Sequence, residues 1–112
     1  MLDYKLYLKE IISMIEKIEN SVLGKTLEDF VNDSNLLDAT LMRLHFIGKT
    51  IKSIPFLLKK NYKKVRWRKF ARLRNIIGHR YSNVNKNIIW DVIKALSELK
   101  VQVKEILEKE EK

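Results

Sequence analysis

Apolar side chains at helical spacing are the feature of this sequence that most constrains its fold. In residues 2–22, 34–54 and 86–109 they recur three and four positions apart, which places them along one face of an α-helix. The 112 residues include only three Gly and one Pro, which is fewer than the turns between many short strands would require. The stripes are Tyr4, Leu8, Ile11, Ile15, Ile18 and Val22; Leu37, Leu41, Leu44, Ile47 (or Gly48), Ile51 and Ile54; and Ile89, Val92, Leu96, Leu99, Val103 and Ile106. The pattern predicts an all-α protein.

Residues near the first stripe predict where two helices begin and end. Gly24 lies in a segment, residues 21–25, that is expected to stop the first helix. Thr26 is the expected N-cap of a short helix over residues 26–32, because Asp29 follows it at the spacing of a capping box.

Further along the chain, Asp33 or Ser34 is the expected cap of a helix that Pro55 ends. Residues 56–64 are rich in lysine and give no clear assignment. A fourth long helix is expected over residues 65–78, and a loop over 82–85 ends in an N-cap candidate for the last helix.

The predicted architecture is an antiparallel helical bundle of four long helices plus a short helix, in one domain over residues 1–112. Apolar residues make up 46% of the chain, which is enough for one core. The stripes of the first and last helices are so long that a monomer would leave parts of them uncovered. We therefore expect a homodimer with two-fold symmetry.

Basic residues are concentrated in the middle of the chain, which has a net charge of +9. No acidic residue lies between Asp38 and Asp91, whereas 14 of the 23 Lys and Arg do. The resulting positive field favours a phosphate-rich partner such as RNA; a solvated basic face is the alternative. The expected RNA-binding residues are Lys59, Lys60, Lys63, Lys64, Arg66, Arg68, Lys69 and Arg80.

Composition also excludes several classes of protein. There is no cysteine, which excludes disulfides and thiolate metal sites. No apolar run approaches the roughly 18 residues that span a membrane, and the N-terminus carries charges where a signal peptide needs apolar residues. We expect a cytoplasmic protein with no membrane association.

The segment 65–78 contains a charged residue in an apolar stripe. Arg74 takes the stripe position between Phe70 and Ile77, and a guanidinium there costs free energy unless an anion meets it. His79 follows Arg74 by five positions, which is about 140° around an ideal α-helix. One chain cannot easily direct both side chains at one phosphate unless the helix ends at Gly78. A dimer whose fourth helices cross near the two-fold axis would bring both side chains to one phosphate.

These residue types suit metal-free RNA cleavage, which needs a base, an acid and donors for the phosphate. Histidine performs proton transfer near neutral pH, and arginine binds phosphate in a bidentate manner; Asn75 adds a polar group on the face of His79. Each candidate also has a structural alternative, in which Arg74 pairs with a core carboxylate, His79 ends a helix and Tyr81 packs. His45, Trp67 and Trp90 are expected to be structural, and no metal site or cofactor is expected.

The stretch RNIIGHRY, Arg74 to Tyr81, fits the pattern Arg, four residues, His, any residue, Tyr. Its flanks are WRKFARLRN before it and NIIWDVI with L-x-x-L after it; the segments DYKLYLKEIISMIEKIE and LDATLMRLHFIGKTIKSIP precede them. Together these segments resemble HepT-like proteins of the HEPN superfamily. The resemblance covers nearly the whole chain.

The resemblance implies a helical-bundle homodimer whose two motifs face each other, acting as a metal-independent endoribonuclease toxin on tRNA or mRNA. It assigns catalysis to Arg74 and His79, with Asn75 in support. It also implies an antitoxin partner, a minimal nucleotidyltransferase of the MntA type that transfers AMP to Tyr81. Two residues depart from the family pattern: Arg80 stands where many relatives have a smaller or acidic residue, and Lys49 where Glu is common.

Two other functions stay open at this point. The first alternative to the ribonuclease is a non-catalytic HEPN binding module that serves as partner and AMP acceptor of a nucleotidyltransferase. The second is a simple RNA-binding bundle. Loss of RNA cleavage on changing His79 separates the enzyme from the first of these.

Overall fold

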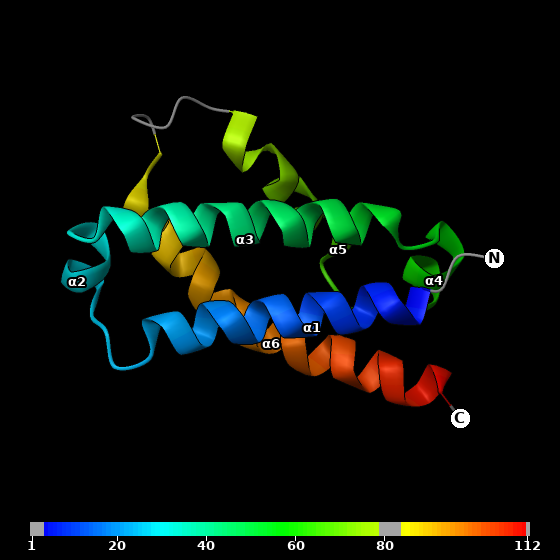
Figure 1. The fold of residues 1–112 in the computed structure, drawn as a ribbon. Helices are drawn as coiled ribbons and strands as arrows, with labels where there is room; N and C mark the ends of the chain where they lie inside the picture. Colours follow the sequence, from blue (N-terminus) through cyan, green and yellow to red (C-terminus); the bar gives the residue numbers. More distant parts are fainter. Residues whose placement is uncertain (1–3, 79–83, 112) are drawn as a thin grey trace.

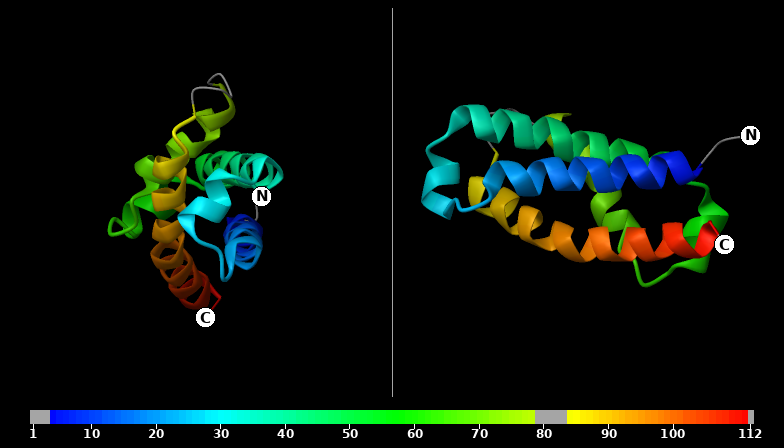
Figure 2. Two further views of the ribbon diagram at one scale, coloured as in Figure 1. Left: turned by 90° about the vertical axis from the view of Figure 1, so that its left-hand side faces the viewer. Right: turned by 60° about the horizontal axis from the view of Figure 1, so that its bottom comes forward.

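Three long helices form the body of the protein (Figures 1 and 2). The computed structural model describes residues 4–78 and 84–111, and within them there is no strand, so the all-α class is confirmed. In chain order the elements are α1 (Tyr4–Val22), α2 (Leu27–Val31), α3 (Ser34–Ser53), α4 (Phe56–Asn61), α5 (Trp67–Ala71), the 3₁₀ helix η1 (Arg72–Gly78) and α6 (Lys86–Glu110). Helix α1 packs against α3 and α6, while η1 lies on the side of α3 away from α1.

The core is formed by the predicted apolar stripes. In α1 the buried residues are Leu8, Ile11, Ile15 and Ile18, as the spacing predicts. In α6 one assignment was wrong, because Ile93 is buried where Val92 was expected and Val92 is only half-buried. The interiors of the first and last stripes are thus covered within one chain, so the argument that a dimer is needed to cover them was wrong. The homodimer itself stays a prediction.

The predicted helix ends near the first turn are confirmed. Helix α1 ends at Val22, and Gly24 follows with a φ of +74°, a conformation that glycine adopts without strain. Thr26 and Asp29 form a capping box, in which each side chain accepts a hydrogen bond from the other's backbone N–H. These bonds from Thr26 lower the pKa of Asp29.

The other predicted caps are also present. Asp33 caps α3 by accepting a bond from the Leu36 backbone N–H at 3.0 Å, and α3 ends before Pro55. Asn85 caps α6, and its side chain accepts bonds from the next helical N–H groups. The lysine-rich segment that the sequence left unassigned begins as the short helix α4.

The predicted fourth long helix over residues 65–78 is wrong. The helix begins at Trp67, and at Arg72 it changes from α to 3₁₀ geometry. Trp67 and Phe70 are buried and anchor α5, and the Trp67 indole N–H donates to the Tyr62 carbonyl at 3.0 Å. Trp90 packs on Phe30, with ring centroids 5.3 Å apart. Trp67 is buried and Trp90 is half-buried against the core, so the expectation that both tryptophans are structural is confirmed.

A carboxylate joins the far end of α6 to the rest of the protein. Glu110 accepts hydrogen bonds from the Tyr62 hydroxyl at 2.7 Å and from the Tyr4 hydroxyl at 2.9 Å. These bonds lower the pKa of Glu110, and the bond to Glu110 raises the pKa of Tyr62. The chain segment after α4 is thereby attached to both α1 and α6.

None of the helices within the described residues is long and apolar enough to cross a membrane.

Candidate functional site

The motif predicted from the sequence begins on η1, where Arg74 and Asn75 are both exposed. The expectation that Arg74 lies in an apolar seam is therefore wrong. A 3₁₀ helix turns about 120° per residue instead of about 100°. The change at Arg72 thus rotates Arg74 away from the face of Phe70. Its guanidinium needs no buried partner and is open to solvent.

Helix η1 is held against α3 by a direct approach of the two backbones at Gly48. A Cβ atom added to Gly48 would overlap the backbone nitrogen of Arg74 and lie 2.9 Å from the Leu73 carbonyl carbon and 3.0 Å from the Ala71 oxygen. Real Cβ atoms do not tolerate such contacts with backbone. Only glycine therefore allows α3 and η1 to pack at this separation.

A histidine of α3 contacts the same point of η1. The Nδ1 atom of His45 lies 2.6 Å from the carbonyl oxygen of Arg74. Because a carbonyl oxygen can only accept a hydrogen bond, Nδ1 is the atom that donates, and Nε2 of the neutral ring then has a free lone pair. The side chain is half-buried. His45 thus fixes the backbone at Arg74 and orients its own second nitrogen.

Sequence reasoning treated His45 as structural, and its hydrogen bond agrees with that role. What the sequence did not indicate was its position beside the motif. The signal was present in the spacing: His45 and Gly48 lie three positions apart and so share one face of α3. Nothing in the sequence, however, indicated which segment that face would contact.

The remaining motif residues lie outside the described part of the chain. His79, Arg80 and Tyr81 fall between its two ranges, 4–78 and 84–111. Their roles, and the arrangement of His79 relative to Arg74, stay predictions. The half of the motif that the structure does describe is the arginine and asparagine on η1.

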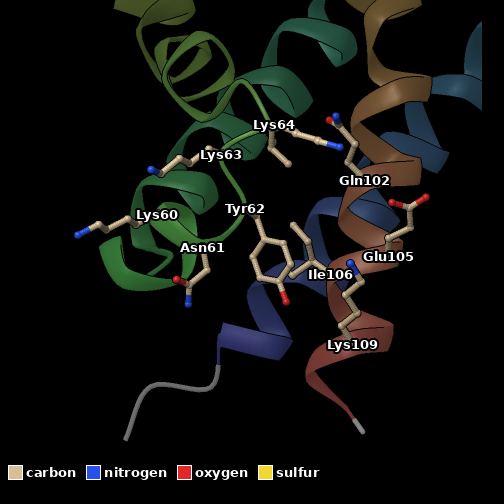
Figure 3. Close-up of a pocket in the computed structure, with 10 residues that line it drawn as sticks. Lys60, Asn61, Tyr62, Lys63, Lys64, Gln102, Glu105, Ile106 and Lys109 are labelled. Atoms are coloured by element: carbon tan, nitrogen blue, oxygen red, sulfur yellow. The ribbon is translucent and has the colours of Figure 1, made fainter.

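Most of the predicted RNA-binding residues lie along α6, in what we call the basic groove (Figure 3). It consists of two hollows that share Lys64 and Gln102. The larger, about 640 Å³, is lined by Lys60, Asn61, Tyr62, Lys63, Lys64, Val65, Gln102, Glu105, Ile106 and Lys109. The smaller, about 100 Å³, is lined by Lys64, Arg66, Lys69, Phe70, Ala95, Glu98, Leu99 and Gln102. Lys109 and the amides of Asn61 and Gln102 were not predicted to take part.

Two of the predicted RNA-binding residues do not line this groove. Lys59 is half-buried, and its ammonium donates to the Ile51 carbonyl near the end of α3 at 3.4 Å. Burial lowers the pKa of Lys59, and the charge of Lys52 lowers it further. Arg68 is exposed on α5 outside both hollows. Lys59 is thus tied to α3, which leaves its ammonium less available to RNA than the groove lysines.

Within residues 4–78 and 84–111, no three side chains of His, Asp or Glu lie close enough together to hold a metal ion.

Comparisons with known proteins agree on one family. The family model described as ribonuclease HepT-like matches residues 11–106. A Caldanaerobacter subterraneus subsp. tengcongensis protein, named as a candidate RNase, is 39% identical over 105 residues, which cover 93% of this chain and 94% of that protein. A Thermococcus cleftensis protein, named a probable ribonuclease HepT, is 33% identical over 91 residues, 81% of this chain and 83% of that protein.

A longer relative comes from Methanocaldococcus jannaschii. It is named a gamma-glutamylcyclotransferase and candidate RNase and is 34% identical over 111 residues, 98% of this chain. The chain spans 50% of the length of that protein. No solved structure is significantly similar to the chain.

The contact at Gly48 predicts a specific defect. In Gly48→Ala, the added methyl group forces η1 away from α3, and we expect a loss of about 1–3 kcal/mol in the free energy of unfolding, as for other overpacked sites. Alanine has the higher helix propensity by about 1 kcal/mol, so any loss reflects the lost packing. Urea unfolding measures the change, and hydrogen exchange should be faster over residues 72–76.

The control is Ser13→Ala at an exposed position of α1, which should change stability by less than about 0.5 kcal/mol. A Gly48→Ala variant that is as stable as the wild type, with unchanged exchange in η1, would show that the approach of the two backbones does not matter.

Proposed function

The chain belongs to the HepT-like ribonuclease family of the HEPN superfamily, and from this we propose that it is a metal-independent endoribonuclease toxin that cleaves tRNA or mRNA. The observation that carries the proposal is the family match over residues 11–106, which includes the whole motif from Arg74 to Tyr81. The exposure of Arg74 and Asn75 on a turn fixed against α3 supports it, because a phosphate can reach both side chains.

The proposed reaction needs no metal ion. A base takes the proton of the RNA 2′-hydroxyl, the 2′-oxygen attacks the neighbouring phosphorus, and the bond from phosphorus to the 5′-oxygen breaks as an acid gives that oxygen a proton. The products are a 2′,3′-cyclic phosphate and a 5′-hydroxyl. Arg74 binds the phosphate and stabilises the charge that develops on it. His79 transfers protons, and Asn75 positions the phosphate.

One histidine is too few for the two proton transfers of this reaction. A two-fold homodimer supplies a second copy of His79 and lets Arg74 of one protomer act with His79 of its partner. The proposal of a shared site rests on the number of proton transfers, since η1 ends at Gly78 and the helical spacing does not extend to His79. His45 offers a further nitrogen near Arg74, although its hydrogen bond to the Arg74 carbonyl assigns it first to positioning.

The proposed control of the enzyme acts at Tyr81. A minimal nucleotidyltransferase of the MntA type, acting as antitoxin, transfers AMP to the Tyr81 hydroxyl. The added phosphate is an anion close in sequence to Arg74 and Arg80, and it would compete with RNA phosphate for those guanidiniums. Modification then blocks RNA binding without unfolding the protein.

Cleavage by the purified protein tests the function directly. We expect the wild type to cut total RNA in the presence of a chelator, and Arg74→Ala and His79→Ala to be slower by about 10²–10³, as for loss of one electrostatic stabiliser. Gel analysis of the products, with mass spectrometry of their ends, measures the rate and identifies the cyclic phosphate. Lys17→Ala, at an exposed site on α1 outside the expected RNA-binding set, is the control for lost charge.

Full activity in His79→Ala would contradict the mechanism, and so would a requirement for magnesium. Urea unfolding of each variant must match the wild type, so that lost activity cannot be attributed to lost structure. A well-folded wild type that binds RNA without cutting it would favour the non-catalytic binding module.

Modification of Tyr81 has its own test. Co-expression with a minimal nucleotidyltransferase should add one or more AMP groups to the wild type and none to Tyr81→Phe, and the modified wild type should lose cleavage while its unfolding curve is unchanged. Intact mass and peptide mapping locate the adduct. AMP on another residue, or a modified protein that cuts RNA at the unmodified rate, would refute control through Tyr81.

A further inference from the structure

The basic groove is built from two parts of the chain that lie far apart in the sequence. One wall is the segment 60–70, from the last residues of α4 to the end of α5, and the other is the part of α6 from Ala95 to Lys109. The two hollows join at Lys64 and Gln102. At the end nearer the motif the groove reaches Phe70 on α5, which continues directly into η1. The groove therefore leads from a large hollow at the end of α6 toward the segment that carries Arg74.

The charge of the groove is strongly positive. Six cations line it, Lys60, Lys63, Lys64, Arg66, Lys69 and Lys109, against two carboxylates, Glu98 and Glu105. Within the described ranges of the chain, none of the six forms a salt bridge. On the α1 side of α6, by contrast, Lys100 and Lys104 pair with glutamates of α1. Lys69 lies over the Phe70 ring, with its ammonium 5.4 Å from the ring centroid. A row of cations without carboxylate partners in the described residues favours a ligand with a row of anions.

The larger hollow also has the chemistry of a base-binding pocket. Figure 3 shows the ring of Tyr62 beside Ile106 at its centre, with Lys64 extended toward Gln102 and Lys109 next to Ile106. Lys60 and Lys63 extend away from Tyr62 and form the rim. The bond from the Tyr62 hydroxyl to Glu110 fixes the ring. Aromatic rings stack with nucleic-acid bases, and a volume of about 640 Å³ is within the range of small-ligand pockets.

We propose that the basic groove binds single-stranded RNA next to the cleavage site, with one base in the larger hollow. The base lies against Tyr62 and Ile106, and the amides of Asn61 and Gln102 bind its edge. Its flanking phosphates bind Lys64 and Lys109, and the strand continues past Arg66 and Lys69 toward η1. A single strand fits better than a duplex, because only an unpaired base can enter the hollow. The proposal rests on the proposed function in taking RNA as the ligand.

The test is binding of a probe that cannot be cleaved. The probe is a fluorescein-labelled 2′-O-methyl RNA of about ten nucleotides, without secondary structure, and fluorescence anisotropy measures its Kd over a range of salt concentrations. The double variant Lys64→Ala/Lys109→Ala should weaken binding at least about tenfold and lower the slope of log affinity against log salt by about 1.4, at about 0.7 per phosphate contact. The control Lys17→Ala/Lys25→Ala removes two exposed charges outside the groove and should change Kd less than about threefold.

Two variants of Tyr62 separate base binding from charge. Tyr62→Leu should weaken binding about tenfold, within the range of one lost stacking interaction, whereas Tyr62→Phe keeps the aromatic face and should stay within about threefold of the wild type. Circular dichroism and urea unfolding of both variants monitor the fold, because Tyr62 also bonds to Glu110. If Tyr62→Leu and Tyr62→Phe lose the same amount of RNA affinity, no base stacks on Tyr62 in the larger hollow.

Other outcomes overturn the proposal as a whole. Equal losses in the groove variant and the control variant would mean that only the overall charge attracts RNA. Unchanged RNA binding, with loss of binding to a polyglutamate peptide, would assign the groove to an acidic protein. Binding of this probe is measured independently of catalysis, because the probe cannot be cleaved. A wild type that binds the probe through the groove but cuts no RNA refutes the proposed function alone, and one that cuts RNA but binds the probe independently of the groove refutes the groove alone.

Discussion

The approach of two backbones at Gly48 is the contact on which the rest of the candidate site depends. It brings η1 so close to α3 that no side chain fits between them. At this separation His45 reaches the carbonyl oxygen of Arg74, and the side chains of Arg74 and Asn75 are exposed. The backbone contact at Gly48 therefore fixes the start of the motif while the charge of Arg74 stays exposed.

The apolar core and the basic region are formed by different segments of the chain. Of the 22 buried hydrophobic residues in the described part of the chain, 16 lie in the three long helices, whose stripes are regular. The segment between α3 and α6 contains short elements and five of the six cations that line the basic groove. Glu110 ties this segment to the body through Tyr62 and Tyr4. A stable helical frame therefore carries a basic region whose own core is small.

The sequence predicted the frame more completely than the site. Stripes at helical spacing and capping residues such as Thr26 and Asp33 act locally, so the ends of α1, α2, α3 and α6 could be read from the chain. The change from α to 3₁₀ geometry at Arg72 could not, because no residue of the segment indicates it. The exposure of Arg74 depends on that change. Likewise, the basic residues could be listed from the sequence, but their gathering along α6 is a tertiary arrangement, and so is the role of Tyr62.

Mixing the wild type with an inactive variant tests most directly the central claim, a site shared between two protomers. Wild type and His79→Ala, in equal amounts, are unfolded together and refolded so that protomers pair at random. About a quarter of the dimers then contain two wild-type protomers, and about half are mixed. The account predicts about a quarter of the cleavage given by the same total amount of wild-type protein, because a mixed dimer has only one of the two His79 side chains that the reaction needs. Cleavage at about half of the wild-type value, although native mass spectrometry detects mixed dimers, would contradict it, since each protomer would then act alone.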